Sequence, residues 1–186
     1  VLIQATGCIT TASNLTFQTN NGSLSFWSNA NGGANGGIYL GDAISLNSAN
    51  GSTTQSTGGG NITLGGGAGS GSIPSGFALS SIAFCTSIVI GCGTSTTANN
   101  SIYTGGGNLS IQGCSTAYYG ISLNDNLNFN SGQGSVTIIG VSNSNITNNS
   151  GIIIGQHAGS NFTILSMAPS GNVINITAVS YTHLTL

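Results

Sequence analysis

The 186-residue chain contains no lysine and no arginine, and its only acidic residues are Asp42 and Asp125. About a quarter of the residues in an average globular domain are charged, so this composition is unusual. Binding to nucleic acid depends on lysine and arginine side chains that neutralise phosphates, and attraction to anionic lipid surfaces depends on the same side chains. The sequence therefore excludes nucleic acid and anionic membrane surfaces as partners.

Long apolar runs are also missing. No run approaches the roughly 18 residues of a membrane span, and residues 1–4 lack the basic region and apolar length of a signal peptide. We expect no membrane insertion of this segment. The chain begins with Val1 rather than Met, and residues 179–186 read VSYTHLTL, which resembles a translated sequencing adapter. We predict that residues 1–178 are a single-domain fragment of a longer protein and that residues 179–186 are a non-native tail.

Glycine and small polar residues dominate what is present. With 31 glycines and many Asn, Ser and Thr residues, disorder is the first interpretation to test. Disordered segments are poor in β-branched and aromatic residues, whereas 38% of this chain is hydrophobic, with regularly spaced Ile, Leu, Val and Phe. These residue types favour strands, so the sequence predicts a folded all-β protein.

An internal repeat organises the chain. Residues 37–52 read GIYLGDAISLNSANGS and residues 120–135 read GISLNDNLNFNSGQGS, which are identical at eight of sixteen positions without a gap. The similarity extends towards the N-terminus, so residues 10–52 and 96–135 are two copies of one unit. The first copy contains three short apolar-x-apolar segments separated by turns that are rich in Gly and Asn.

Three brief strands per unit predict a right-handed parallel β-helix, a β-solenoid in which each coil stacks on the last at about 4.8 Å. We expect about five coils of three short strands, spaced by 27 to 47 residues, with a flexible insertion at residues 65–76. Neutral polar ladders replace charges, because like charges on adjacent coils would repel. Strand alternation predicts that these residues of the first copy point inward: Leu24, Phe26, Ile38, Leu40, Ile44 and Leu46.

The repeated phrases GGGNLSI, GISLNDN and GSVTI resemble the shaft repeats of large bacterial surface adhesins, the filamentous-haemagglutinin-like and autotransporter passenger proteins. The resemblance spans most of residues 10–178. It implies a secreted structural shaft that is displayed on the bacterial outer cell surface and has no enzymatic activity. Its expected partners are neighbouring coils of the parent chain and surface glycans, which it would contact weakly and multivalently.

Two alternative functions use the same fold. The first is a polysaccharide-active enzyme, in which Asp42 and Asp125 are the catalytic pair, since glycosidases use two carboxylates. The repeat predicts that they lie two or three coils apart, about 10 to 14 Å, near or beyond the upper limit of about 9.5 Å for an inverting pair. Turn formation is the favoured interpretation of both residues. The second alternative is an ice-binding solenoid, which needs regular outward Thr arrays that the scattered Thr residues do not provide.

No cofactor or metal site is predicted. Cys8, Cys85, Cys92 and Cys114 lack zinc-ligand spacing, and His157, in an expected exposed loop, has no second native histidine. Three of the cysteines occur in Gly-Cys-x-Thr phrases, which favours repeated turn or small-core positions. A disulfide between Cys85 and Cys92 is the alternative.

Outward-facing aromatic residues are the candidate ligand contacts. Strand parity predicts that Trp27 and Tyr39 point outward, and Tyr118 and Tyr119 lie in an expected corner loop. These four residues would stack against sugars. The alternative interpretation is that the rings pack beneath the loops.

Overall fold

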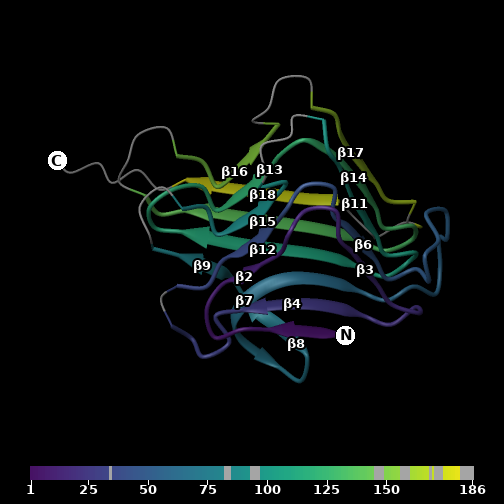
Figure 1. Ribbon diagram of the computed structural model, residues 1–186, viewed down its shortest axis with the longest axis horizontal. Helices are drawn as coiled ribbons and strands as arrows, with labels where there is room; N and C mark the ends of the chain where they lie inside the picture. Colours follow the sequence, from purple (N-terminus) through teal and green to yellow (C-terminus); the bar gives the residue numbers. More distant parts are fainter. Residues whose placement is uncertain are drawn as a thin grey trace.

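The computed structural model describes residues 1–33, 35–81, 85–92, 97–144, 149–155, 160–167, 169 and 174–180. Within these residues the chain forms eighteen β-strands and no helix. The strands belong to three sheets, and the strands of successive coils pair in parallel, apart from an isolated antiparallel bridge between Gly36 and Leu79 (Figure 1). The predicted parallel β-helix is confirmed.

Each complete coil contributes one strand to each sheet. Sheet A has the order β1 (Leu2–Gln4), β4 (Leu24–Ser28), β7 (Ile62–Ser70), β12 (Leu109–Ser115), β15 (Val136–Ser142) and β18 (Ile174–Ser180). Sheet B contains β2 (Ile9–Thr10), β5 (Ile38–Leu40), β10 (Ile88–Ile90), β13 (Ile121–Leu123) and β16 (Ile152–Ile154). Sheet C contains β3 (Thr16–Gln18), β6 (Ser45–Asn47), β11 (Asn99–Tyr103), β14 (Asn126–Asn130) and β17 (Phe162–Leu165). The chain therefore completes five coils and begins a sixth with β18.

The strand register fixes how the repeat is stacked. Tyr39 pairs with Val89, which pairs with Ser122, so the two copies lie two coils apart with one divergent coil between them. Along sheet A, the spacing between paired residues is 27 from Leu109 to Val136 and 47 from Ile62 to Leu109. These values match the expected range of coil lengths, but the first coil is shorter, with a spacing of 23 from Leu2 to its partner Ser25.

The glycine-rich insertion differs from its prediction. Residues 65–76 were expected to form a flexible loop, but β7 continues to Ser70 and β8 (Ile73–Gly76) returns antiparallel to it. A short strand, β9 (Ala78–Ser80), then pairs with β12. The insertion is therefore a hairpin that lies on the outer side of sheet A.

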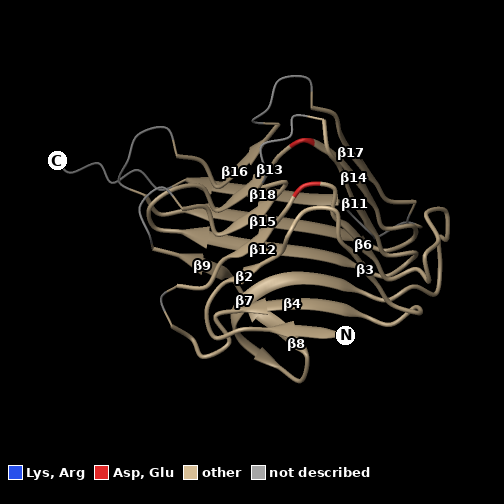
Figure 2. Cartoon of the chain, viewed as in Figure 1, with Lys and Arg blue, Asp and Glu red and all other residues tan. Residues whose placement is uncertain are grey.

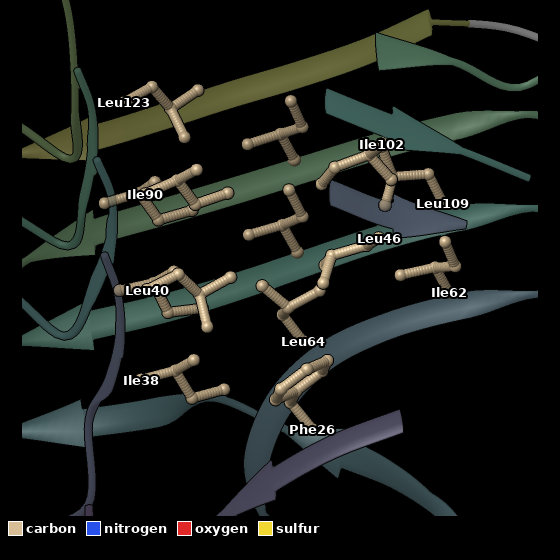
Figure 3. Packing of buried hydrophobic residues seen from close by; sticks show 14 of the residues in the cluster. Phe26, Ile38, Leu40, Leu46, Ile62, Leu64, Ile90, Ile102, Leu109 and Leu123 are labelled. Carbon is tan, nitrogen blue, oxygen red and sulfur yellow. The ribbon is translucent and has the colours of Figure 1, made fainter. Parts of the chain in front are cut away.

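Columns of apolar side chains fill the interior (Figure 3). Leu40, Ile90 and Leu123 occupy paired positions on three successive coils, and each is at most 1% exposed. Burial of this kind contributes about 25 cal/mol for each Å² of apolar surface, and a single coil could not achieve it alone. The six residues predicted to point inward are all at most 2% exposed: Leu24, Phe26, Ile38, Leu40, Ile44 and Leu46.

A glycine column forms the corner between sheets C and A. Gly22, Gly60, Gly107 and Gly134 each stand two residues before the first sheet A residue of their coil. A Cβ on Gly107 would lie 2.1 Å from the carbonyl oxygen of Gly60, and one on Gly134 would lie 1.9 Å from that of Gly107. No side chain fits between coils that approach so closely, which explains why the repeated phrase begins with glycine.

The residue after each of these glycines connects the coils by a polar ladder. The backbone N–H of Asn108 donates to Oδ1 of Asn61 (2.8 Å), and the N–H of Ser135 donates to Oδ1 of Asn108 (2.9 Å). A buried hydroxyl closes the corner itself: within the connection from β6 to β7, Ser48 donates to the carbonyl of Gly60 at 2.6 Å. Neutral side chains satisfy the backbone here without placing one charge above another, as the sequence predicted.

Val179 and Ser180, the first two residues of the segment that resembles an adapter, complete β18. They pair with Val141 and Ser142 of β15. Residues 181–186 lie outside the described residues.

Candidate functional site

The two carboxylates lie at the corner between sheets B and C, on coils separated by one other coil (Figure 2). Two coil spacings correspond to about 10 Å along the stack, the lower end of the predicted range. The intervening coil places Gly91 and Cys92 at this corner. A Cβ on Gly91 would lie 2.6 Å from Oδ2 of Asp125, and the charge of Asp42 adds to burial in raising the pKa of the Cys92 thiol.

Both aspartates belong to turns between short strands. Asp125 is 1% exposed and has a left-handed backbone (φ 62°), a conformation that Asp adopts more readily than most residues. Asp42 is 9% exposed, and its backbone N–H donates a hydrogen bond to Oγ of Ser13 at 3.0 Å. In this copy the left-handed residue is Ala43 (φ 53°). The two corners have the same length. The left-handed residue is the aspartate in the second copy and the residue after the aspartate in the first copy.

The four cysteines are free and do not form the alternative disulfide. Cys8 and Cys92 are exposed, and Cys85 and Cys114 are half-buried, so the small-core interpretation is wrong. The reason is register: Cys8 precedes β2, Cys92 follows β10 and Cys114 lies within β12. The shared Gly-Cys-x-Thr phrase therefore does not mark one structural position. Burial raises the pKa of the Cys114 thiol.

His157 lies outside the described residues. In the ranges that are described, no group of three or more His, Cys, Asp or Glu residues could hold a metal ion. The same ranges contain no helix long and apolar enough to cross a membrane.

Trp27 points away from the coil interior, as predicted, but the hairpin covers it. Its ring is only 7% exposed, and its indole N–H donates to the carbonyl of Gly67 at 2.9 Å. A Cβ on Gly69 would lie 2.6 Å from the ring, so the glycines allow the hairpin to lie flat against the indole. The alternation of residues along the strand predicted that Trp27 points outward, but it did not predict that the hairpin covers the side chain.

Tyr39 is half-buried on sheet B. Burial raises its pKa from the ordinary 10.0 to about 12, and the neighbouring Cys8 and Cys85 add to the rise. A Cβ on Gly37 would lie 2.5 Å from the phenol oxygen, which shows how closely the ring follows the chain.

Tyr118 and Tyr119 lie in the connection between β12 and β13, and both are half-buried. Their ring centroids are 4.1 Å apart with an interplanar angle of 49°. A hydrogen bond with Tyr118, followed by burial, raises the pKa of Tyr119. They belong to the second copy, two coils from Trp27 and Tyr39, so the four candidate aromatics do not form one site.

A groove of about 410 Å³ lies on the outer face of sheet C, where the sequence predicted no site. It crosses three adjacent strands, β11, β14 and β17, and amide side chains predominate in its lining. The lining consists of Asn99, Asn100, Ser101, Tyr103, Asn126, Leu127, Asn128, Asn161 and Thr163. The sequence feature that marks this groove is a set of polar residues at alternate positions of three paired strands. This feature can be recognised only when the register between the strands is known.

No protein-family model, no curated protein and no solved structure matches this chain.

Proposed function

We propose that this segment is part of the shaft of a secreted, surface-displayed bacterial adhesin, and that it acts as a spacer with weak multivalent contacts. The observation that carries the proposal is the uniform stacking order of the three sheets. The main strands of each coil pair with those of the coil before and the coil after, as in other quasi-one-dimensional arrays. Such an array provides length and stiffness.

Exposed apolar residues on the terminal coils support the expected partnership with further coils. Ile174 and Ile176 of β18 are each 43% exposed, and at the other end Ile3 of β1, which pairs with the buried Phe26, is only half-buried. Their paired residues in inner coils, such as Val136 and Ile138, are fully buried. Coils stacked on either end would bury these side chains and pair the open strand edges.

The low charge of the chain supports a structural rather than an enzymatic role. The two carboxylates lie on different coils with Gly91 and Cys92 between them, and no lysine or arginine exists to assist a reaction. Neutral hydrogen bonds between coils need no specific counter-ion. A secreted shaft could therefore keep its structure over a wide range of ionic strength.

Sequencing the source gene beyond both ends of this segment tests the proposal. We expect further coils with the Gly-Asn/Ser-apolar-x-apolar phrase, a signal peptide upstream and an outer-membrane anchor downstream. Antibodies raised against this segment should label intact cells, and brief protease treatment of the cells should remove the label. An open reading frame confined to about these residues, or labelling only after lysis, would contradict it.

The enzyme alternative has its own test. The chain and its Asp42→Asn and Asp125→Asn variants would be incubated with neutral polysaccharides, and newly formed reducing ends would be measured. We expect none from any of the three proteins. Release by the parent chain that is lost in either variant would replace the shaft proposal with the enzyme.

A further inference from the structure

The outer face of sheet C carries in-register columns of uncharged polar side chains. Asn99 pairs with Asn126, and Ser101 pairs with Asn128, which pairs in turn with Thr163. These positions recur at the spacing of the coils, about 4.8 Å. The groove of about 410 Å³ runs over these columns, and its volume is within the range of small-molecule sites.

Several of these polar groups are directed to solvent. Asn99, Asn128, Asn161 and Thr163 are exposed, and the side chains of Asn99, Asn161 and Thr163 make no hydrogen bond within the described part of the chain. An amide offers two donors and an acceptor, and a hydroxyl offers one donor and two lone pairs. The groove therefore presents closely spaced donors and acceptors to the solvent.

Tyr103 provides an aromatic surface at one end of the groove. It is half-buried, and its hydroxyl accepts a hydrogen bond from Nδ2 of Asn128 at 3.2 Å. Asn130, the residue paired with Tyr103 on the next coil, donates to the carbonyl of Thr53 at 3.3 Å. The hydrogen bond from Asn128 restrains the orientation of the Tyr103 ring, which limits the entropy lost when a ligand packs against it.

The charge of the groove selects the class of ligand. The whole chain contains no lysine or arginine, so an anionic ligand such as a uronate or a sulfated sugar would find no cation to pair with. Amide and hydroxyl groups instead match the hydroxyls of a neutral sugar, and an aromatic ring matches its C–H face.

From these observations we infer that the outer face of sheet C binds an extended neutral oligosaccharide, which lies across β11, β14 and β17 and packs against Tyr103. The exposed amides of Asn99, Asn128 and Asn161 contact its hydroxyls. This inference deepens the proposed function by naming the ligand of its weak contacts, and it rests on that function for the setting in which the groove meets glycans. It moves the sugar contact away from Trp27, Tyr39, Tyr118 and Tyr119.

The test is a titration of the isotopically labelled chain with three neutral hexasaccharides, composed of β-1,4-glucose, β-1,4-mannose or β-1,4-N-acetylglucosamine. Side-chain amide resonances of the groove are followed by NMR. We expect at least one probe to shift the resonances of Asn99, Asn128 and Asn161 with a Kd of about 1 mM, which corresponds to about 4 kcal/mol. A galacturonate hexasaccharide should bind at least tenfold more weakly.

Three variants locate the site. Tyr103→Ala should weaken binding at least tenfold, and Asn161→Ala, at an exposed position, should weaken it about threefold without affecting the fold. The matched control is Tyr118→Ala, at the corner between sheets A and B, which should bind as the parent does. Circular dichroism and backbone spectra would verify that each variant keeps the parent structure.

The failures of the two proposals can be told apart. If none of the three neutral probes shifts a groove resonance, or if Asn161→Ala and Tyr103→Ala bind as tightly as the parent, the sugar groove is wrong while cell-surface labelling can still succeed. If Tyr118→Ala alone abolishes binding, the corner aromatics form the site and the inference is overturned. Sugar binding together with labelling only after lysis would retain the groove and reject the shaft.

Discussion

The two copies of the repeat, residues 10–52 and 96–135, have the same strand path but different surroundings. Their inward positions are interchangeable: Leu46 and Phe129 are both fully buried and both pair with Ile102 of the coil between them. Their outward positions are not. The first copy has Trp27 beneath a hairpin, whereas the equivalent residue of the second copy is the half-buried Gln112.

This difference shows which constraints the stack imposes. A coil must supply apolar residues inside and glycine where backbones approach, so those positions repeat. What covers the outer face depends on insertions in neighbouring coils, since the hairpin over Trp27 is formed by β7 and β8 of the next coil. The first copy is therefore adapted to the hairpin of its neighbour, and the second copy leaves its outer face available.

Core truncation should have the largest effect in either copy, and it tests their equivalence. Phe129→Ala should destabilise the chain by about 3–5 kcal/mol and Leu46→Ala by somewhat less, within about 2–5 kcal/mol, because the larger ring leaves the larger cavity. Phe129 also makes an edge-to-face contact with Phe162, with centroids 5.7 Å apart. Denaturant unfolding followed by circular dichroism measures both costs.

Phe129→Leu, which copies the residue of the first unit, is the control for this pair. Its cost should be well below that of Phe129→Ala, because most of the buried volume is kept. A larger loss from Leu46→Ala than from Phe129→Ala would show that the two copies do not contribute equivalent cores.

Exchanging the outward residues should have the next largest effect. Trp27→Gln introduces the residue of the second copy, removes the bond to Gly67 and uncovers the hairpin, at an expected cost of about 2–4 kcal/mol. Hydrogen exchange in residues 67–76 should accelerate strongly, while exchange in β12 and β15 should change little. The reverse change, Gln112→Trp, should alter stability by less than about 0.5 kcal/mol. Unchanged exchange in the hairpin would mean that Trp27 does not hold it.

High pH should distinguish the copies through Tyr39, since the second copy has Ser122 at the equivalent position, two coils away. The pKa of Tyr39 is about 12 in the folded chain and 10.0 in the ordinary case, so the unfolded chain loses this proton first. Stability should therefore fall as pH rises from about 10 to about 12, and Tyr39 should contribute no pH dependence below that window. Tyr39→Phe should remove this part of the loss, as measured by denaturant unfolding at pH 9 and pH 11. An equal loss in the variant would contradict the assignment.

The sequence predicted the features that depend on local periodicity. The inward residues, the coil lengths and the neutral ladders all follow from period-two alternation and from the repeat itself. The strands β1 and β2 were missed because Leu2–Gln4 and Ile9–Thr10 are too short to show that alternation.

The features that were not predicted depend on register between coils of unequal length. The groove joins Asn99, Asn126 and Asn161, which are 27 and 35 residues apart in sequence, and nothing in one strand alone marks the site. The cover over Trp27 likewise needs the return path of β8. The Gly-Cys-x-Thr phrases were misleading because similar sequences occupy structurally unrelated positions in different coils.

Glycine substitutions at the corner between sheets B and C should produce the smallest effects on stability. Their signs should be opposite in the two copies, because only the first copy has a strained residue at the substituted position. Ala43 has a left-handed backbone (φ 53°), which costs a non-glycine residue about 1–2 kcal/mol, so Ala43→Gly should stabilise the chain by about 1 kcal/mol. The matched control is Asn126→Gly, because Asn126 follows Asp125 as Ala43 follows Asp42 but is not left-handed. That change should destabilise by about 1 kcal/mol, since it removes the acceptor for the N–H of Asn161 and adds glycine entropy. Denaturant midpoints measured side by side would test this: if both glycines destabilise the chain, the strain at Ala43 is smaller than the entropy cost of glycine.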